Sequence, residues 1–293
     1  MTVVDDRAAV AAALTYRPVT PEELTTCAGI WRDGINDYVR RLNQPDVPEE
    51  FAPLVRLYAH LQGTDPERFI AATDGDGRLV AFASAVVRER LWFLSMCFVL
   101  PEVQGAGVGR SLVARLLPAE RDGMVCGTAT DSAQPISNAL YGTFGIVPRV
   151  PLLNLVGEAG HATLSDAVDA LDREVLGVAH PVDHRFLRQE GRHGWLYLGP
   201  DGVALGYGYA GEAGRVGPVA VRDEALLGPV LGHLMTAVVP RGAFALWLPG
   251  TADRALVPAL QAGFRMDQVP ILLCWDRPFA DLARYLPISP GLL

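Results

Sequence analysis

The sequence predicts an α/β protein, α+β in detail, made of two similar domains in tandem, each with a mixed and mostly antiparallel sheet flanked by helices. Half of the 293 residues are hydrophobic and 20% are charged, which permits a core in each of two domains of about 150 residues. Short apolar runs alternate with amphipathic stretches, as strands and helices do. The order of these elements also recurs, in a weaker form, near the C-terminus. We expect one domain in residues 1–160 and a second, beginning with a linker helix, in residues 161–293.

The N-terminal half is predicted to begin with a loose, Ala-rich tail over residues 1–12 and a strand that ends at Pro18. Pro21 opens a helix behind the N-cap Thr20. The elements that follow are a helix from about residue 48 to 61, strands at 68–73, 79–87 and 91–100, a helix beginning near 108, a strand at 124–129, a helix over 131–141 and a strand at 147–156. Pro148 and Pro151 predict that this last strand is irregular or lies at a sheet edge.

The C-terminal half is predicted to begin with an amphipathic linker helix over residues 164–176. The elements after it are strands at 195–198, 203–209 and 216–221, a helix at 224–238, a strand at 244–248, a helix at 253–261 and a strand at 269–275. This order matches the second half of the N-terminal domain, which indicates an internal repeat.

Composition argues against several classes of protein. The net charge of −8 disfavours nucleic acid and anionic membranes as partners. No apolar run reaches the length of about 18 residues that crosses a bilayer, and no secretion signal precedes the first strand. The four cysteines are scattered without a C-x-x-C pair, which predicts reduced thiols. All 25 basic residues are arginine, which favours a bacterial source. We expect a cytoplasmic protein.

A glycine-rich turn follows the most apolar strand. Pro101 ends the strand, and glycines stand at positions 105, 107 and 109 before a helix begins. Glycines let a backbone approach a diphosphate closely, and the amides of a helix N-terminus carry about half a positive charge. The spacing G-x-G-x-G departs from the G-x-G-x-x-G of dinucleotide-binding folds, and a Walker loop needs lysine, which this chain lacks. The turn is therefore either another kind of diphosphate site or an ordinary connection.

The segment V-x-P-x-x-Q-G-x-G-x-G, from Val99 to Gly109, resembles the coenzyme A pyrophosphate loop of the GNAT superfamily of acyl-CoA-dependent N-acyltransferases. The register is Gln-Gly-x-Gly-x-Gly, beginning at Gln104. On this resemblance the chain is expected to hold two tandem GNAT-like domains.

A second segment, from Gln134 to Ile146, is similar to the N-x-x-A-x-x-L-Y-x-x-x-G-F helix of the same family. Leu140, Tyr141 and Gly145 keep the register, whereas Gln134 stands in the usual Asn position and Ile146 in the usual Phe position. Together the two segments carry a resemblance over residues 13–157.

The resemblance implies that acetyl-CoA is the co-substrate. The turn and the first turn of the helix would hold its diphosphate, and backbone amides of the preceding strand would hold the pantetheine and polarise the thioester carbonyl. The implied cofactor-binding residues are Phe98, Val99, Gln104, Gly105, Ala106, Gly107, Val108, Gly109, Arg110 and Asn138.

The resemblance also implies that Tyr141 is the general acid that protonates the departing thiolate, since a phenol is ordinarily protonated at neutral pH. The general base is not identified. Glu89 and Asp131 are candidates, because they stand at the start of one strand and the end of the next. Glu102, a water relay and the C-terminal carboxylate of Leu293 also stay open.

The C-terminal half resembles a degenerate GNAT domain. Val221 is followed by Arg-Asp-Glu-Ala-Leu instead of a glycine turn, and Ala259 stands where the first half has Tyr141. We therefore expect that this half does not bind coenzyme A. His180 and His184 suggest a ligand pair, but two histidines in a Pro-containing linker are usually structural, and we expect no metal.

These features predict an N-acetyltransferase that moves an acetyl group from acetyl-CoA to a primary amine by direct attack in a ternary complex. The acceptor is expected to be a small molecule or a peptide, and the protein a monomer or homodimer. Two alternatives stay open: a non-catalytic protein that binds or senses acyl-CoA, and acyl chemistry with a non-amine acceptor.

Overall fold

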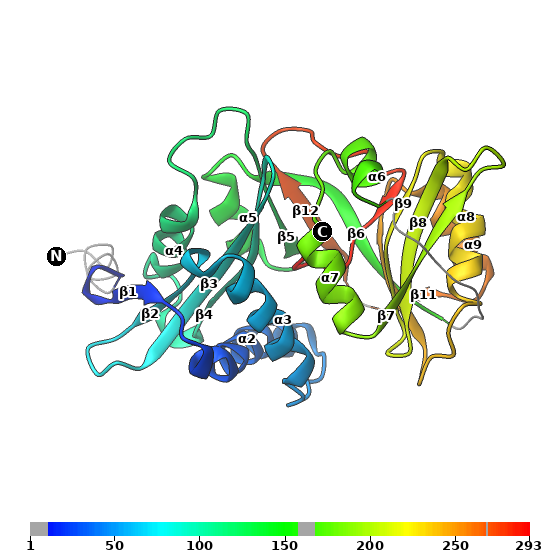
Figure 1. Ribbon diagram of the computed structural model, residues 1–293. Coiled ribbons are helices and arrows are strands. Elements are labelled where there is room, and N and C mark those ends of the chain that lie inside the picture. Colours follow the sequence, from blue (N-terminus) through cyan, green and yellow to red (C-terminus); the bar gives the residue numbers. More distant parts are fainter. Residues whose placement is uncertain (1–10, 158–167, 268) are drawn as a thin grey trace. The chain divides into compact units, whose positions relative to one another are not determined.

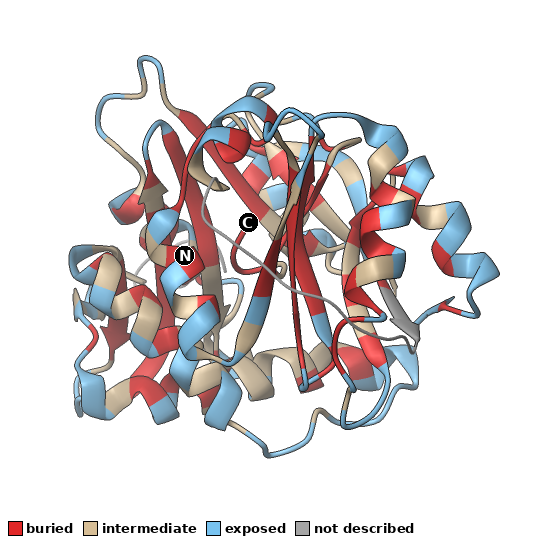
Figure 2. Ribbon diagram, turned by 45° about the vertical axis from the view of Figure 1, so that its right-hand side comes forward, coloured by how far each residue is buried: buried red, intermediate tan, exposed pale blue. Residues whose placement is uncertain are grey.

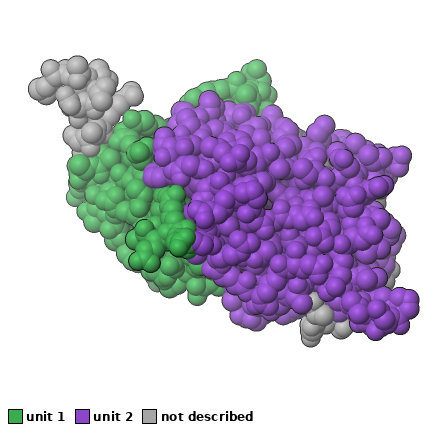
Figure 3. Space-filling model, turned by 90° about the horizontal axis from the view of Figure 1, so that it is seen from above, with its two compact units in different colours: residues 1–87, 92–122 green, residues 88–91, 123–293 purple. Residues whose placement is uncertain are grey.

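The computed structural model describes residues 11–157, 168–267 and 269–293, so the predicted tail lies almost wholly outside the described residues. The chain divides into two compact units (Figure 3). Unit 1 comprises residues 1–87 and 92–122, and unit 2 comprises residues 88–91 and 123–293. The predicted boundary at residue 160, between an acetyl-CoA-binding domain and a second domain, stays a prediction.

Unit 1 is an antiparallel β-meander with helices (Figure 1). Its strands are β1 (Thr15–Pro18), β2 (Phe69–Thr73), β3 (Leu79–Arg88) and β4 (Leu91–Val99), which neighbour one another in that order. Its α-helices are α2 (Leu24–Val39), α3 (Ala52–Thr64) and α4 (Val108–Leu116). The tip of the β3–β4 hairpin, residues 88–91, belongs to unit 2.

Apolar side chains from both faces explain why these segments form a unit. Nearly every residue of β2 and β3 is buried, and the rings of Tyr58, Phe69 and Phe82 pack at centroid distances of 5.4–5.8 Å. Each such aromatic contact stabilises the fold by about 0.5–1.5 kcal/mol beyond the free energy gained by burying apolar area. Part of the core of unit 1 therefore lies between the meander and α3.

Unit 2 holds a second, larger set of strands, in the order β5-β12-β6-β10-β9-β8-β7. Their bounds are β5 Val125–Asp131, β6 Val147–Gly157, β7 Arg192–Leu198, β8 Ala204–Gly211, β9 Arg215–Val221, β10 Phe244–Pro249 and β12 Ile271–Trp275. The short strands β11 (Arg265–Met266) and β13 (Tyr285–Leu286) pair with β6 and β9. All pairings that involve β12 are antiparallel.

Among the described residues, five α-helices accompany this sheet: α5 (Pro135–Gly142), α6 (Val168–Val175), α7 (Pro181–Gln189), α8 (Leu227–Leu234) and α9 (Asp253–Gln261). Buried residues of β8, β9 and β10 pack with those of α8 and α9 into one apolar core. Figure 2 shows the result: the strands are mostly buried, and the helices are buried on one side and exposed on the other.

The structure confirms the predicted fold class, a mixed α/β chain whose sheet is mostly antiparallel. Most predicted elements occur within a few residues of their expected bounds, including the three strands, helix, strand and helix that repeat in the C-terminal half. The first residues of the predicted linker helix, 164–167, lie outside the described residues, and the rest of it is α6. None of the described helices is long and apolar enough to cross a membrane.

Of the two alternatives that the prolines of β6 predict, the edge position is wrong. β6 lies between β12 and β10. Pro148 and Pro151 are paired with β12, whereas the described pairing with β10 covers Leu152–Gly157. A strand directs each amide to one side only, so both prolines fall where β6 has one partner. The other alternative, an irregular strand, is confirmed. The pairing of β6 with β12 shifts register, because Leu273 pairs with Val150 and the next residue, Cys274, pairs with Pro148.

The segment that follows the linker helix also differs from its prediction. From the sequence we treat it as a Pro-containing linker and assign no helix to it, but the segment forms α7. Pro181 occupies the first turn of this helix, where a missing amide costs nothing and the fixed φ favours the helix.

Candidate functional site

The turn between β4 and α4 has the backbone that its glycines predict. Gly105 has φ 77° and Gly107 has φ 81°, both in the left-handed region that side chains rarely adopt. Gly107 is the N-cap of α4, and its carbonyl accepts the amide of Ser111 at 3.0 Å. Helix geometry gives the amides of Val108 and Gly109 no acceptor within the helix. The first turn of α4 therefore presents backbone donors and the positive end of a helix dipole.

Packing and hydrogen bonds hold α4 in place behind this turn. Val108, Leu112 and Leu116 are buried along one side of the helix. The indole of Trp92 on β4 donates to the carbonyl of Leu116 at 2.9 Å. At its exposed side, the guanidinium of Arg115 lies 3.8 Å from the ring centroid of Tyr16. Contacts near the C-terminus of α4 thus fix the direction in which its N-terminus points.

The strand before the turn becomes accessible toward the glycines. Residues 92–95 of β4 are buried, whereas Met96 to Val99 are half-buried. Phe98 stacks on Phe82 at a centroid distance of 5.9 Å. The α2 backbone approaches closely here: a Cβ built on Gly34 would lie 3.3 Å from the Phe98 ring. The predicted pantetheine-binding residues Phe98 and Val99 therefore stand beside α2.

The predicted diphosphate-binding residues differ in their exposure. Gly105, Gly107 and Arg110 are exposed, Gln104 and Gly109 are half-buried, and Ala106 and Val108 are buried. The side-chain amide of Gln104 donates to the carbonyl of Val99 at 3.0 Å, so it ties the turn to the end of β4. The side chain of Gln104 thus has a structural partner, which the loop motif does not indicate.

The remaining predicted site residues lie in unit 2. Tyr141 lies on α5 and is 5% exposed. The side-chain amide of Asn138 donates to the carbonyls of Asp131 and Gln134 at 3.1 and 3.0 Å, so it joins α5 to the end of β5. The carboxylate of Asp131 accepts the amide of Ala133 at 2.9 Å.

The candidate bases Glu89 and Glu102 each pair with an arginine. Glu89 lies 2.6 Å from Arg173, and the hydrogen bond from that guanidinium lowers the pKa of the Glu89 carboxyl. Glu102 lies 2.8 Å from Arg78, and hydrogen bonds from its own backbone amide and from Arg78 lower its pKa. A lower pKa makes a carboxylate a weaker base.

The equivalent turn in the C-terminal half, between β9 and α8, is built differently. It carries Asp223, whose carboxylate accepts the amide of Ala225 at 2.9 Å. A helical turn at Glu224–Leu226 then leads into α8. An acidic side chain already occupies this helix N-terminus, and its charge would repel a phosphate.

One comparison with known proteins matches part of the chain to a protein family. The family model described as "Acetyltransferase (GNAT) family" matches residues 33–146, which contain β4, the glycine turn, α4 and α5. The match thus covers less than half of the chain. No curated protein matches this sequence.

Solved structures extend the likeness to almost the whole chain. A Pyrococcus horikoshii protein described as an acetyltransferase is 14% identical with a TM-score of 0.74, and the match covers 96% of each chain. A GCN5-related N-acetyltransferase from Sphaerobacter thermophilus is 18% identical, with a TM-score of 0.58, over 93% of this chain and 98% of that one. A tandem GNAT protein from the clavulanic acid biosynthesis pathway is 14% identical, with a TM-score of 0.54, over 90% and 99%. At these identities the likeness shows the fold.

Proposed function

We propose that this protein transfers an acetyl group from acetyl-CoA to a primary amine of a small molecule or a peptide. The observation that carries the proposal is the turn between β4 and α4, where Gly105 and Gly107 adopt left-handed conformations directly before a helix N-terminus. Backbone donors there suit the diphosphate of coenzyme A. The GNAT match of residues 33–146 supports acyl transfer as the reaction.

Donor binding is assigned to residues of unit 1. The amides of residues 104–110 hold the diphosphate, and Arg110 adds a positive charge beside it. The strand end at Phe98 and Val99 holds the pantetheine and polarises the thioester carbonyl. Asn138 of unit 2 is proposed as a further contact. Its buried Oδ1 has no hydrogen-bond partner among the described residues, which leaves one acceptor for a ligand.

The transfer step is a direct attack. The neutral amine nitrogen bonds to the thioester carbonyl carbon, and the C–S bond then breaks. Tyr141 gives its proton to the departing thiolate, and the amide product loses a proton to a base. Hydrogen bonds lower the pKa values of Glu89 and Glu102, which makes both weaker bases, and Asp131 and a water relay are the other candidates.

The arginine partners of Glu89 and Glu102 also favour a second candidate function, a protein that binds or senses acyl-CoA without transferring the acyl group. One experiment separates the two functions. Full-length protein is incubated with acetyl-CoA and a panel of small amines and peptides, and release of free coenzyme A thiol is followed. Transfer predicts amine-dependent thiol release and a product whose acetyl group mass spectrometry places on nitrogen. Acetyl-CoA binding without thiol release would overturn transfer and leave the sensor, and acetylation on oxygen or sulfur would overturn the amine acceptor.

A further inference from the structure

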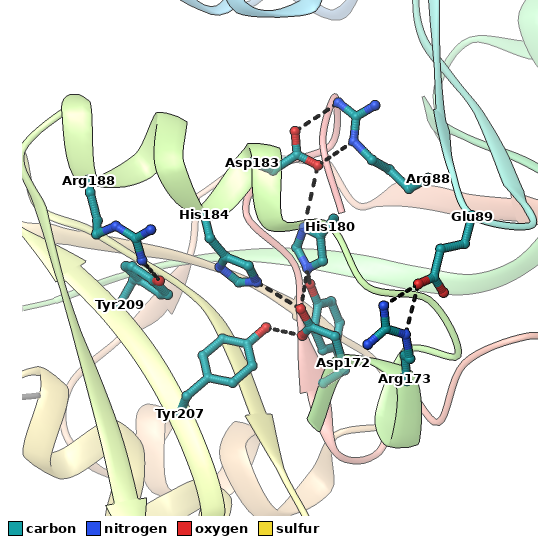
Figure 4. Close-up of polar contacts among 11 residues, drawn as sticks. Arg88, Glu89, Asp172, Arg173, His180, Asp183, His184, Arg188, Tyr207 and Tyr209 are labelled. Atoms are coloured by element: carbon teal, nitrogen blue, oxygen red, sulfur yellow. Dashed lines mark hydrogen bonds and ion pairs between the residues drawn. The ribbon is translucent and has the colours of Figure 1, made fainter. Parts of the chain in front are cut away.

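A buried cluster of two histidines and an aspartate lies in unit 2 (Figure 4), and none of the three is among the residues assigned to acetyl transfer. Asp172 comes from α6, His180 precedes α7 and His184 lies on its first turns. The Asp172 Oδ2 atom is 2.7 Å from His184 Nε2 and 3.2 Å from His180 Nε2. The three residues are 0%, 1% and 2% exposed. Three donor atoms thus converge inside the protein.

The local fold explains why these donors meet. His180 is the N-cap of α7, and His184 follows four residues later, so both side chains fall on one side of the helix. Their rings lie 4.4 Å apart between centroids. A spacing of four residues between histidines on a helix is typical of metal ligands. The sequence contains this spacing, but nothing in it indicates that Asp172 joins the pair.

Further polar groups surround the donors. His180 Nδ1 faces the carboxylate of Asp183 at 3.5 Å, and Arg88 holds that carboxylate through two hydrogen bonds of 2.7 and 2.9 Å. Tyr207 donates to the second oxygen of Asp172. In metal sites the outer nitrogen of a ligating histidine usually faces a carboxylate, which orients the ring. Asp183 stands near that position, although His180 Nδ1 has no hydrogen-bond partner among the described residues, and Tyr207 orients the Asp172 carboxylate.

We propose that Asp172, His180 and His184 form a structural site for a divalent transition metal, with zinc as the ion. Two imidazole nitrogens and one carboxylate oxygen form a ligand set that zinc accepts in tetrahedral geometry. Ligand bonds of about 2.0–2.1 Å separate tetrahedral donors by about 3.3 Å. The distance from Asp172 to His180 matches this value, and the Asp172–His184 distance needs to widen by about half an ångström.

Tyr285 is the fourth donor that the geometry offers. Its hydroxyl lies 3.4 Å from His180 Nε2 and is buried, so it stands at the spacing of a neighbouring ligand. Four protein donors make a closed site, which is typical of structural zinc rather than catalytic zinc. The site would join α6, α7 and β13, three elements that are distant from the glycine turn in sequence.

A proton is the competitor of the metal. Burial alone would lower the pKa of His180, but Asp172 and Asp183 raise it. Burial alone would raise the pKa of Asp172, but the two histidines lower it. Metal ligands bind in their deprotonated form, so zinc competes with protons for these donors.

Metal analysis of the full-length protein tests the proposal. Protein produced in zinc-supplemented medium and dialysed against metal-free buffer should retain about one zinc per chain. His184→Gln should reduce the zinc content several-fold, whereas His193→Gln, a change at an exposed histidine of β7, should leave it unchanged. Metal-free protein, or zinc retained equally by both variants, would overturn the proposal.

A second measurement does not depend on the folding of a variant. Metal-free wild-type protein is titrated with Co²⁺, and its visible spectrum and melting temperature are recorded. We expect d–d bands of a tetrahedral nitrogen and oxygen site, saturating at one equivalent, and a higher melting temperature. Absence of both changes would show that protons alone hold the cluster, and a thiolate-to-cobalt band would place the metal on a cysteine. Either result overturns the proposal and leaves the proposed acetyl transfer intact.

Discussion

At the scale of single residues, the two halves differ in what occupies a helix N-terminus. Left-handed Gly107 begins α4 without a side chain, whereas Asp223 fills the corresponding turn with its own carboxylate. Glycine leaves backbone donors available to an anion, and aspartate uses one of them and adds a repelling charge. The loss of the glycines is visible in the sequence. The hydrogen bond made by Asp223 becomes visible only in the structure.

Tyr141→Phe tests the general acid. The variant removes one hydroxyl from a buried ring, so we expect turnover to fall by about 10²-fold or more, the usual contribution of a general acid. Acetyl-CoA affinity should stay within about twofold, because the proposed diphosphate contacts lie elsewhere. Steady-state kinetics and calorimetry measure the two quantities.

The matched control is Tyr58→Phe. The hydroxyl of Tyr58 is buried in the core of unit 1 and has no hydrogen-bond partner among the described residues. Its removal should leave both turnover and affinity unchanged. Equal turnover in wild type and Tyr141→Phe would exclude Tyr141 as the acid.

At the scale of elements, the sequence predicts those helices, strands and turns whose formation depends on residues close to one another in the chain. Apolar runs, proline boundaries and the glycine spacing locate β4, the turn and α4 correctly. Tyr141 and the turn residues follow from motifs. The pairing of β12 between β5 and β6 does not follow, because its partners are more than 100 residues away in the sequence and no local pattern encodes the register. For the same reason the sequence leaves an edge position open for β6.

Contacts between elements are likewise beyond the sequence. The approach of Gly34 to Phe98, and the arginines that hold Glu89 and Glu102, join residues that no motif connects. These contacts bear on the site, since one positions the strand end and the others weaken two candidate bases. Side-chain partners of this kind can be identified only once the fold is known.

Gly34→Leu tests the contact between α2 and β4. The added side chain would meet the Phe98 ring, so we expect the free energy of unfolding to fall by about 1–3 kcal/mol, as in other overpacked cores. The shifted strand end should also weaken acetyl-CoA binding. Denaturant unfolding and calorimetry measure both effects.

Gly29→Leu is the control on the same helix, because a Cβ there would meet nothing within 4 Å. Leucine favours a helix over glycine by up to about 1 kcal/mol, so this variant should be at least as stable as wild type. If both variants behave alike, the close approach at Gly34 has no role in positioning β4.

At the scale of the whole molecule, the chain repeats one arrangement of elements and places the glycine turn in only one copy among the described residues. The repeat was predictable from the order of strands and helices. The buried Asp172 cluster was only half predictable, because the His180 and His184 spacing is local and the aspartate is not. We therefore predict one acetyl-CoA site per chain, at the N-terminus of α4.

Calorimetric titration of acetyl-CoA into wild type, Gly107→Glu and Gly77→Glu tests this claim most directly. Gly77 has φ 80° in the β2–β3 turn and open space around it, so its variant carries the same backbone strain as Gly107→Glu without a charge at α4. We predict one site per chain in wild type and Gly77→Glu, and no measurable binding in Gly107→Glu. Equal affinity in the two variants, or a second equivalent bound per chain, would contradict the account.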